Sequence, residues 1–343
     1  MWRLAQSLGL IGGCAVLAAA GPGTHAAIQS RSIVGSYSLV TRITKPFRVQ
    51  ARGVLVIDTY NRSTGAITGH GADVSGSAPL AMTGSVHGST IKMRVVNDAG
   101  VASDTGRIHS GGTIDGVIVA KIAGAYGGGV ETGTWTMTPS IVTVGQVGLS
   151  VVHLGHVDTE VSYGIELRDS SASRDATNVT LDVRPLTKAG KLASGDAFVS
   201  PLLSPASVIP AGQTFYFGSH ESLTGDVPVA RLRVTVVAGA IPPKRRVLPP
   251  VSNIRIDHGR GTITATLTNP YSKPISPYDY TASLVVYDGN GRIIGGDDGP
   301  AISIGGLSSR DIKPGAQAPI KAFFPEDVPG SSIASARITI APL

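Results

Sequence analysis

Short runs rich in Val, Ile, Thr and Tyr recur along this sequence, and Gly, Pro, Asn or Asp separate one run from the next. This pattern limits the fold more than any other feature of the chain. After residue 27, no stretch has apolar residues at the 3.6-residue spacing of an amphipathic helix. β-Branched and aromatic residues favour strands, whereas Gly, Pro, Asn and Asp favour the turns between strands. The sequence therefore predicts an all-β protein built as sandwiches or barrels.

The size and composition of the chain agree with several folded domains. The 343 residues correspond to two or three domains at roughly 100–200 residues each. The hydrophobic fraction of 42% suffices to build cores, which argues against a disordered, collagen-like or coiled-coil chain. The net charge of +6 is spread thinly, and aromatic residues do not alternate with basic ones, so we expect no nucleic-acid partner.

Residues 28–140 contain about eight candidate strands with turn residues between them. In residues 90–96, Ile91, Met93 and Val95 share one face, and charged side chains share the other. Such alternation is typical of a strand that is buried on one side only. Eight consecutive short strands of this kind predict an antiparallel β-barrel, with a two-sheet sandwich as the alternative.

The remainder of the chain contains an internal repeat of about 100 residues, which is expected for two copies of one domain. The matching segments are 167–191 with 267–292, 209–213 with 312–317, and 233–236 with 337–340. The repeat predicts two immunoglobulin-like sandwiches in tandem, at residues 141–240 and 251–343. Paired prolines at 241–250 predict a stiff, basic linker between them.

The second copy carries several motifs of one domain family. They are Thr266-Leu267-Thr268-Asn269, residues 282–294 with the letters ASLVVYDGNGRII, Ile312-Lys313-Pro314-Gly315, and an aromatic residue at Phe323 or Phe324. With these motifs it resembles the FxLYD-type domain of bacterial secreted and cell-surface proteins. The first copy departs from the pattern, because Leu186-Thr187 stands where that family has Tyr-Asp. The resemblance covers about half the chain and implies an extracytoplasmic β-sandwich module without catalytic residues.

The N-terminus has the layout of a Sec signal peptide. Arg3 gives a basic start, Leu4–Ala20 is an uncharged apolar run, and small residues lead to a cleavage site after Ala26. We therefore expect residues 1–26 to be removed and the mature protein to be secreted, periplasmic or exposed on the cell surface. No later segment is apolar over about 18 residues, so no membrane span is expected after the signal is removed.

Cys14 is the only cysteine, and it leaves one alternative open for export. The residues before it loosely resemble a lipobox, which would make the protein a lipid-anchored lipoprotein. The chain remains apolar from Ala15 to Ala20, where a lipoprotein usually becomes polar, and this favours plain secretion. Cleavage after Ala26 leaves a mature chain without cysteine, which excludes disulfides and thiolate catalysis.

No catalytic or metal-binding pattern stands out, and no cofactor is expected. His153 and His156 are three residues apart, which places them on opposite faces of a strand. Residues 218–222, with the letters GSHES, lack the form of a nucleophile turn and predict a bend between strands. The pair Asp297-Asp298 lies among glycines and predicts a solvated turn, and residues 288–291 predict a hairpin turn.

The main functional hypothesis is an exported, non-catalytic binding or structural protein of the bacterial envelope or exterior, whose partner is an unknown envelope component or protein. The basic cluster Lys244, Arg245 and Arg246 in the linker is the candidate surface for an anionic envelope polymer or lipid. A hydrolase acting on the envelope is a weaker alternative, because no catalytic constellation accompanies it.

The rival hypothesis is that the N-terminal barrel carries a small apolar ligand, since eight-stranded barrels can enclose one. The candidate lining residues are Tyr37, Leu39, Ile91, Met93, Val95 and Trp135. The same side chains would serve equally as a packed core. A cavity above about 300 Å³ would favour the carrier, and a filled interior would favour the core.

Overall fold

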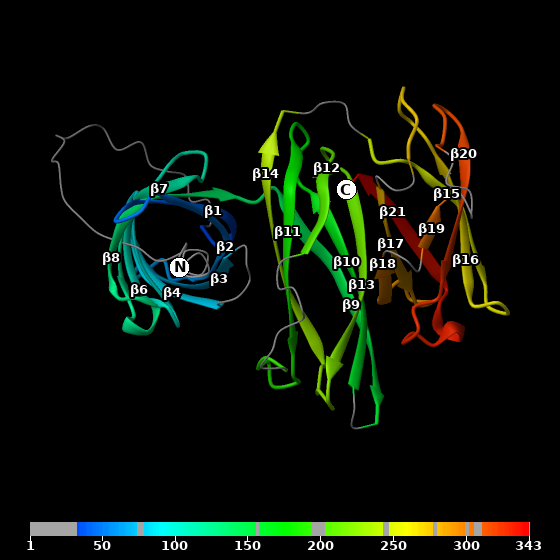
Figure 1. The fold of residues 1–343 in the computed structure, drawn as a ribbon, viewed down its shortest axis with the longest axis horizontal. Helices are drawn as coiled ribbons and strands as arrows, with labels where there is room; N and C mark the ends of the chain where they lie inside the picture. Colours follow the sequence, from blue (N-terminus) through cyan, green and yellow to red (C-terminus); the bar gives the residue numbers. More distant parts are fainter. Residues whose placement is uncertain are drawn as a thin grey trace. The chain divides into compact units, whose positions relative to one another are not determined.

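The computed structural model describes residues 33–73, 79–155, 158–193, 203–242, 247–276, 280–298, 302–304 and 311–342. These residues form antiparallel strands with short 3₁₀ turns, which confirms the all-β prediction (Figure 1). The chain divides into two compact units, one ending at Ser140 and one beginning at Ile141.

The first unit is a closed eight-stranded barrel in which each strand pairs with the next along the chain. Its strands are β1 (Gly35–Lys45), β2 (Val49–Tyr60), β3 (Ala66–Asp73), β4 (Pro79–His87), β5 (Thr90–Asn97), β6 (Gly100–Ile108), β7 (Ile114–Ile122) and β8 (Gly129–Pro139). Pairing of β1 with β8 closes the barrel, with Leu39 opposite Met137. This closure decides between the barrel and the sandwich that the sequence left open.

The barrel follows the predicted alternation. In β5, Ile91, Met93 and Val95 are buried, whereas Lys92 and Arg94 are exposed. The large Trp135 ring fits inside because the adjacent strands β6 and β7 present glycines beneath it. A Cβ at Gly106 or Gly116 would lie 2.6 or 2.8 Å from ring carbons of Trp135.

The second unit contains two sandwiches, each made of two antiparallel sheets. In the first sandwich, one sheet holds β9 (Val142–Leu154), β10 (Asp158–Asp169) and β13 (Thr214–Thr224), and the other holds β11 (Asp175–Leu186), β12 (Leu203–Ile209) and β14 (Arg231–Ile241). In the second, one sheet holds β15 (Val251–Asp257), β16 (Thr262–Thr268), β19 (Ile302–Ile304) and β20 (Gln317–Phe323), and the other holds β17 (Tyr280–Tyr287), β18 (Ile293–Asp298) and β21 (Ser335–Pro342). Each sandwich has its own apolar core between its sheets.

The motif residues quoted for the second copy have structural roles. Asn269 is buried, and its side-chain amide donates hydrogen bonds to the carbonyl oxygens of Lys273 (2.9 Å) and Ile312 (2.8 Å). It thereby joins two loops at one end of the sandwich. Between β17 and β18, the carboxylate of Asp288 accepts bonds from the backbone N–H groups of Asn290 and Arg292, which confirms the predicted hairpin turn.

The two sandwiches pack against each other through the sheet β9–β10–β13 and the sheet β17–β18–β21 (Figure 1). We call this contact the inter-sandwich interface. The backbones approach closely because glycines lie on it: a Cβ on Gly218 would lie 1.9 Å from the Leu284 carbonyl oxygen, and one on Gly148 would lie 1.9 Å from that of Ile293. Only glycine leaves room for this approach.

Two serine hydroxyls join the backbones across the inter-sandwich interface. The Ser162 hydroxyl donates to the Gly296 carbonyl (2.7 Å) and accepts from the Gly296 N–H (3.0 Å). In the opposite direction, the Ser283 hydroxyl accepts from the Gly218 N–H (2.6 Å) and donates to its carbonyl (3.2 Å). Each buried hydroxyl thus has both a donor and an acceptor partner, as buried polar groups require.

Candidate functional site

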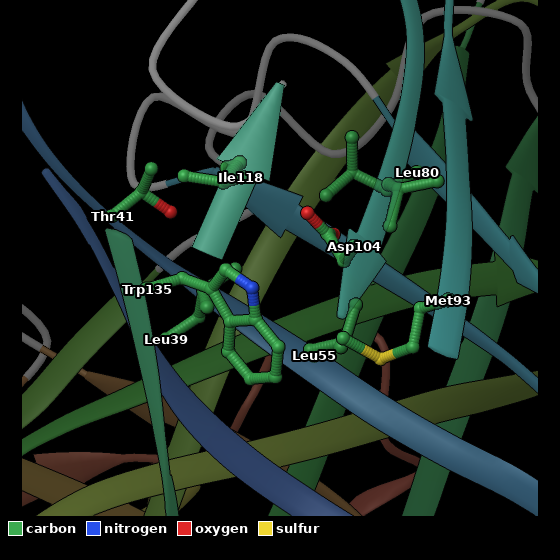
Figure 2. Close-up of a pocket in the computed structure, with 9 residues that line it drawn as sticks. Leu39, Thr41, Leu55, Leu80, Met93, Asp104, Ile118 and Trp135 are labelled. Carbon is green, nitrogen blue, oxygen red and sulfur yellow. The ribbon is translucent and has the colours of Figure 1, made fainter. Parts of the chain in front are cut away.

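The barrel encloses a small cavity, shown in Figure 2. Nine side chains line it: Leu39, Thr41, Leu55, Leu80, Met93, Val95, Asp104, Ile118 and Trp135. Its volume is about 10 Å³, which is room for about one water molecule. Around this cavity, the described side chains of the core therefore fill the interior, as expected for a small closed barrel.

Four of the six side chains expected to line a barrel ligand site are at this cavity: Leu39, Met93, Val95 and Trp135. Tyr37 and Ile91 are buried in the same core without reaching the cavity. The Tyr37 hydroxyl donates to the Ile33 carbonyl oxygen at 2.7 Å. The sequence interpretation therefore identified the barrel interior but not its most unusual member, Asp104.

Asp104 is a carboxylic acid in an apolar interior. It is 7% exposed, its side chain lies near Leu80, Ile118 and Trp135 (Figure 2), and its Oδ1 has no hydrogen-bond partner among the described residues. Burial raises the pKa of Asp104 well above its ordinary value, which favours the neutral acid. The two-residue alternation of β6 could have indicated this placement, because Asp104 is in phase with the buried Ala102.

A second polar cluster lies at the inter-sandwich interface, where Glu160, His220 and Asp327 converge. The Nε2 atom of His220 lies 3.2 Å from Glu160 Oε2 and 2.9 Å from Asp327 Oδ2. All three atoms are buried, and none has a hydrogen bond of acceptable geometry within the described part of the chain. We call these three residues the His220 cluster.

The fold holds each member of the His220 cluster in place. Glu160 on β10 pairs with Ser222 on β13, and the Ser222 hydroxyl donates to Glu160 Oε1 at 2.8 Å. His220 lies two residues before Ser222, so its side chain points from the same face of the sheet. Asp327 comes from a turn of the second sandwich, which buried Val328 anchors in that core. The Ser150 hydroxyl of the first sandwich donates to the Asp327 carbonyl oxygen.

Burial changes the acidity of Asp327 and of three acidic groups near the His220 cluster. Burial raises the pKa of Glu221, Asp297 and Asp327, and in each case the charge of His220 opposes the shift. Burial, reinforced by the negative charge of Asp297, raises the pKa of Asp298 to about 6. Glu221, Asp297 and Asp298 therefore place further carboxyl groups near His220.

The structure corrects two predictions near this cluster. Residues 218–222 form part of strand β13, not a bend between strands, and Asp297-Asp298 lie in β18, not in a solvated turn. The polar and glycine residues that resembled turn signals belong to strand faces that the other sandwich covers. Sequence reasoning missed the His220 cluster because Asp327 lies far from Glu160 and His220 along the chain.

Three other histidines each form an ion pair with one carboxylate. His153 forms an ion pair with Asp226 (2.8 Å), and His70 and His109 pair with Asp58 (2.8 Å) and Asp115 (2.7 Å) in the barrel. His156, residues 1–26 with Cys14, and the basic cluster Lys244, Arg245 and Arg246 lie outside the described residues. Among the residues that are described, no helix has the length and apolar character needed to cross a membrane.

Comparison with known proteins adds no relative to this picture. The chain matches no protein-family model, and no curated protein matches it. The resemblance of the second sandwich to FxLYD-type domains therefore stays a prediction.

Proposed function

We propose that this is an exported bacterial protein without catalytic activity, which acts as a binding or structural component of the cell envelope or exterior. The observation that carries the proposal is the inter-sandwich interface. Backbone contact at Gly148 and Gly218, with hydrogen bonds through Ser162 and Ser283, makes one stiff module from two sandwiches. A stiff module suits a protein that holds a surface in place for a partner, because little freedom is lost on binding.

The size of the barrel cavity argues against the carrier alternative. Pockets for small organic ligands have volumes of roughly 300–1,000 Å³, whereas this cavity is about 10 Å³. The side chains around it, such as Leu55 and Trp135, already occupy the interior. Native mass spectrometry of the mature chain purified from an exporting host is expected to give the mass of the polypeptide without an apolar cargo. A cargo that maps to the barrel would restore the carrier hypothesis.

Export is tested by producing the full chain in an exporting bacterium and sequencing the N-terminus of the product. We expect extracytoplasmic protein that begins at Ala27. Leu17→Arg places a charge in the apolar run and should leave the protein unprocessed inside the cell. Cys14→Ser should change nothing if the general peptidase cleaves after Ala26. Loss of processing in Cys14→Ser would instead identify a lipoprotein, and a wild-type product retaining Met1 inside the cell would contradict export.

Binding to the envelope is tested by sedimenting the mature protein with isolated envelope fractions at low and high salt. Alanine at Lys244, Arg245 and Arg246 is expected to weaken an association that is sensitive to salt. The matched control places alanine at three exposed basic residues of the barrel, Lys92, Arg94 and Lys121. Equal loss in both triple variants would show general charge attraction and remove the linker from the proposal.

A further inference from the structure

We propose that Glu160, His220 and Asp327 bind one divalent transition-metal ion, for which Zn²⁺ is the best match, and that this ion fastens the two sandwiches together. Glu160 and His220 belong to the first sandwich and Asp327 to the second. The site exists only when the inter-sandwich interface is formed. Imidazole nitrogen and carboxylate oxygen are both ordinary ligands of Zn²⁺.

The spacing of the ligand atoms agrees with this assignment. Zinc–nitrogen and zinc–oxygen bonds of about 2.0–2.2 Å place neighbouring ligands of a tetrahedral ion about 3.3 Å apart. His220 Nε2 lies 3.2 Å from Glu160 Oε2 and 2.9 Å from Asp327 Oδ2. All three ligand atoms lie within 4.8 Å of one another. The carboxylate oxygens of Glu160 and Asp327 carry like charges, and a cation between them would attract both.

An ion pair between protonated His220 and the two carboxylates explains the arrangement less well. One Nε2–H group can point at only one acceptor, and a hydrogen bond weakens steeply when it is bent. Here two carboxylate oxygens share the same nitrogen at short distance, yet neither contact has hydrogen-bond geometry. Asp327 is only 6% exposed, so its Oδ2 has little water to replace the missing partner. A shared cation would satisfy all three atoms together.

The charge and the surroundings also suit a divalent transition metal. Two carboxylates carry the charge that neutralises one divalent ion, and the acidic groups Asp297 and Asp298 lie near His220. The Ser222 hydroxyl bonds Glu160 Oε1 and orients the ligand, as outer partners of metal ligands commonly do. The His220 side chain is 32% exposed, so part of its ring reaches solvent beside the site. Calcium prefers six to eight oxygen ligands and fits a site with one imidazole poorly.

The test uses the untagged mature chain, residues 27–343, after treatment with a chelator. Titration calorimetry and metal analysis are expected to show one tightly bound Zn²⁺ per chain, and weak or no binding of Ca²⁺. Zinc should also slow hydrogen exchange in β13 and in the turn that holds Asp327, without changing exchange in the barrel. Wild-type protein that is folded but binds no zinc would overturn the proposal.

Variants assign the site to its residues. Asp327→Asn and Glu160→Gln should each lower zinc affinity by more than about 100-fold, because losing a ligand costs more than losing an outer partner. Ser222→Ala should lower zinc affinity about 10-fold. His153→Asn is the control, since His153 faces a single carboxylate, Asp226, at 2.8 Å. Zinc binding that is lost equally in His153→Asn would place the metal elsewhere and refute the site.

X-ray absorption on wild-type protein loaded with zinc keeps the test decisive if a ligand variant fails to fold. The expected spectrum shows nitrogen and oxygen ligands that include a single imidazole. A spectrum with two or more imidazoles, or with none, would refute the assignment to the His220 cluster.

Discussion

Replacing Gly218 with alanine isolates the contribution of the inter-sandwich interface to stability. Gly218 lies within β13 and has no positive φ, so alanine meets no backbone strain there. The added methyl group would lie 1.9 Å from the Leu284 carbonyl oxygen and 2.5 Å from the Asp297 nitrogen. Both obstacles are backbone atoms of the other sandwich, which cannot move aside as the end of a side chain can. The two sheets must separate.

The size of the effect follows from the hydrogen bonds that cross the interface. Reaching an ordinary contact of 3.4 Å from 1.9 Å requires a separation of about 1.5 Å. The bonds through Ser162 and Ser283 measure 2.6–3.2 Å and would all exceed 3.5 Å after such a shift. At about 0.5–1.5 kcal/mol for each of four bonds, the free energy of unfolding of the second unit should fall by about 2–6 kcal/mol.

Urea unfolding with two probes measures this change. Trp2 and Trp135 are the only tryptophans, so in the mature chain the fluorescence of Trp135 reports on the barrel. Far-UV circular dichroism reports on both units. Gly218→Ala should move the dichroism transition of the second unit to lower urea and leave the Trp135 transition in place.

Gly145→Ala provides the matched control. Gly145 also lies in a strand of the first sandwich, but the three atoms nearest to a Cβ there are side-chain atoms of Glu166, the closest at 3.2 Å. A flexible side chain can move away, so the expected change is within about 0.5 kcal/mol. Equal stability of Gly218→Ala and Gly145→Ala would refute the close packing of the two sandwiches and the argument built on it.

Three further changes probe each unit separately. Leu55→Ala removes a buried side chain at the barrel cavity and should cost about 2–5 kcal/mol in the Trp135 unfolding transition, whereas Val117→Ala on the barrel exterior should cost little. Because burial raises the pKa of Asp104, the folded barrel keeps a proton that the unfolded chain releases above its ordinary pKa of 3.8. The stability of the wild-type barrel should therefore fall as pH rises above about 4, and Asp104→Asn should remove this loss. The urea midpoint of the variant should exceed that of the wild type by more at pH 7.5 than at pH 4. A variant midpoint below that of the wild type at pH 7.5 would contradict the burial of an acid at this position. Asn178 has φ 50° at an irregular point of β11, so Asn178→Ala should cost about 1–2 kcal/mol by calorimetry and Asn178→Gly much less; equal costs would contradict the role of the backbone.

Local patterns were sufficient to predict the strands of the barrel. The alternation in β5 and the turn residues between strands act within a few residues, so they can be read from the sequence. The closure of the barrel could not be read in this way. It depends on pairing of β1 with β8, about a hundred residues apart, and no short pattern encodes that pairing. For Asp104, the alternation of β6 marks the strand face that it shares with Ala102, and closure of the barrel then buries that face.

The residue pattern predicts the all-β class, the repeat of the second unit, and which side chains share a strand face. What covers each of these faces depends on contacts between distant segments of the chain. Ser162, Gly164 and Gly218 belong to a polar face that would be solvated in an isolated sandwich, but here a second sheet lies against it. The His220 cluster arises for the same reason. Alternation along a strand marks two faces, whereas the partner of each face comes from distant parts of the chain.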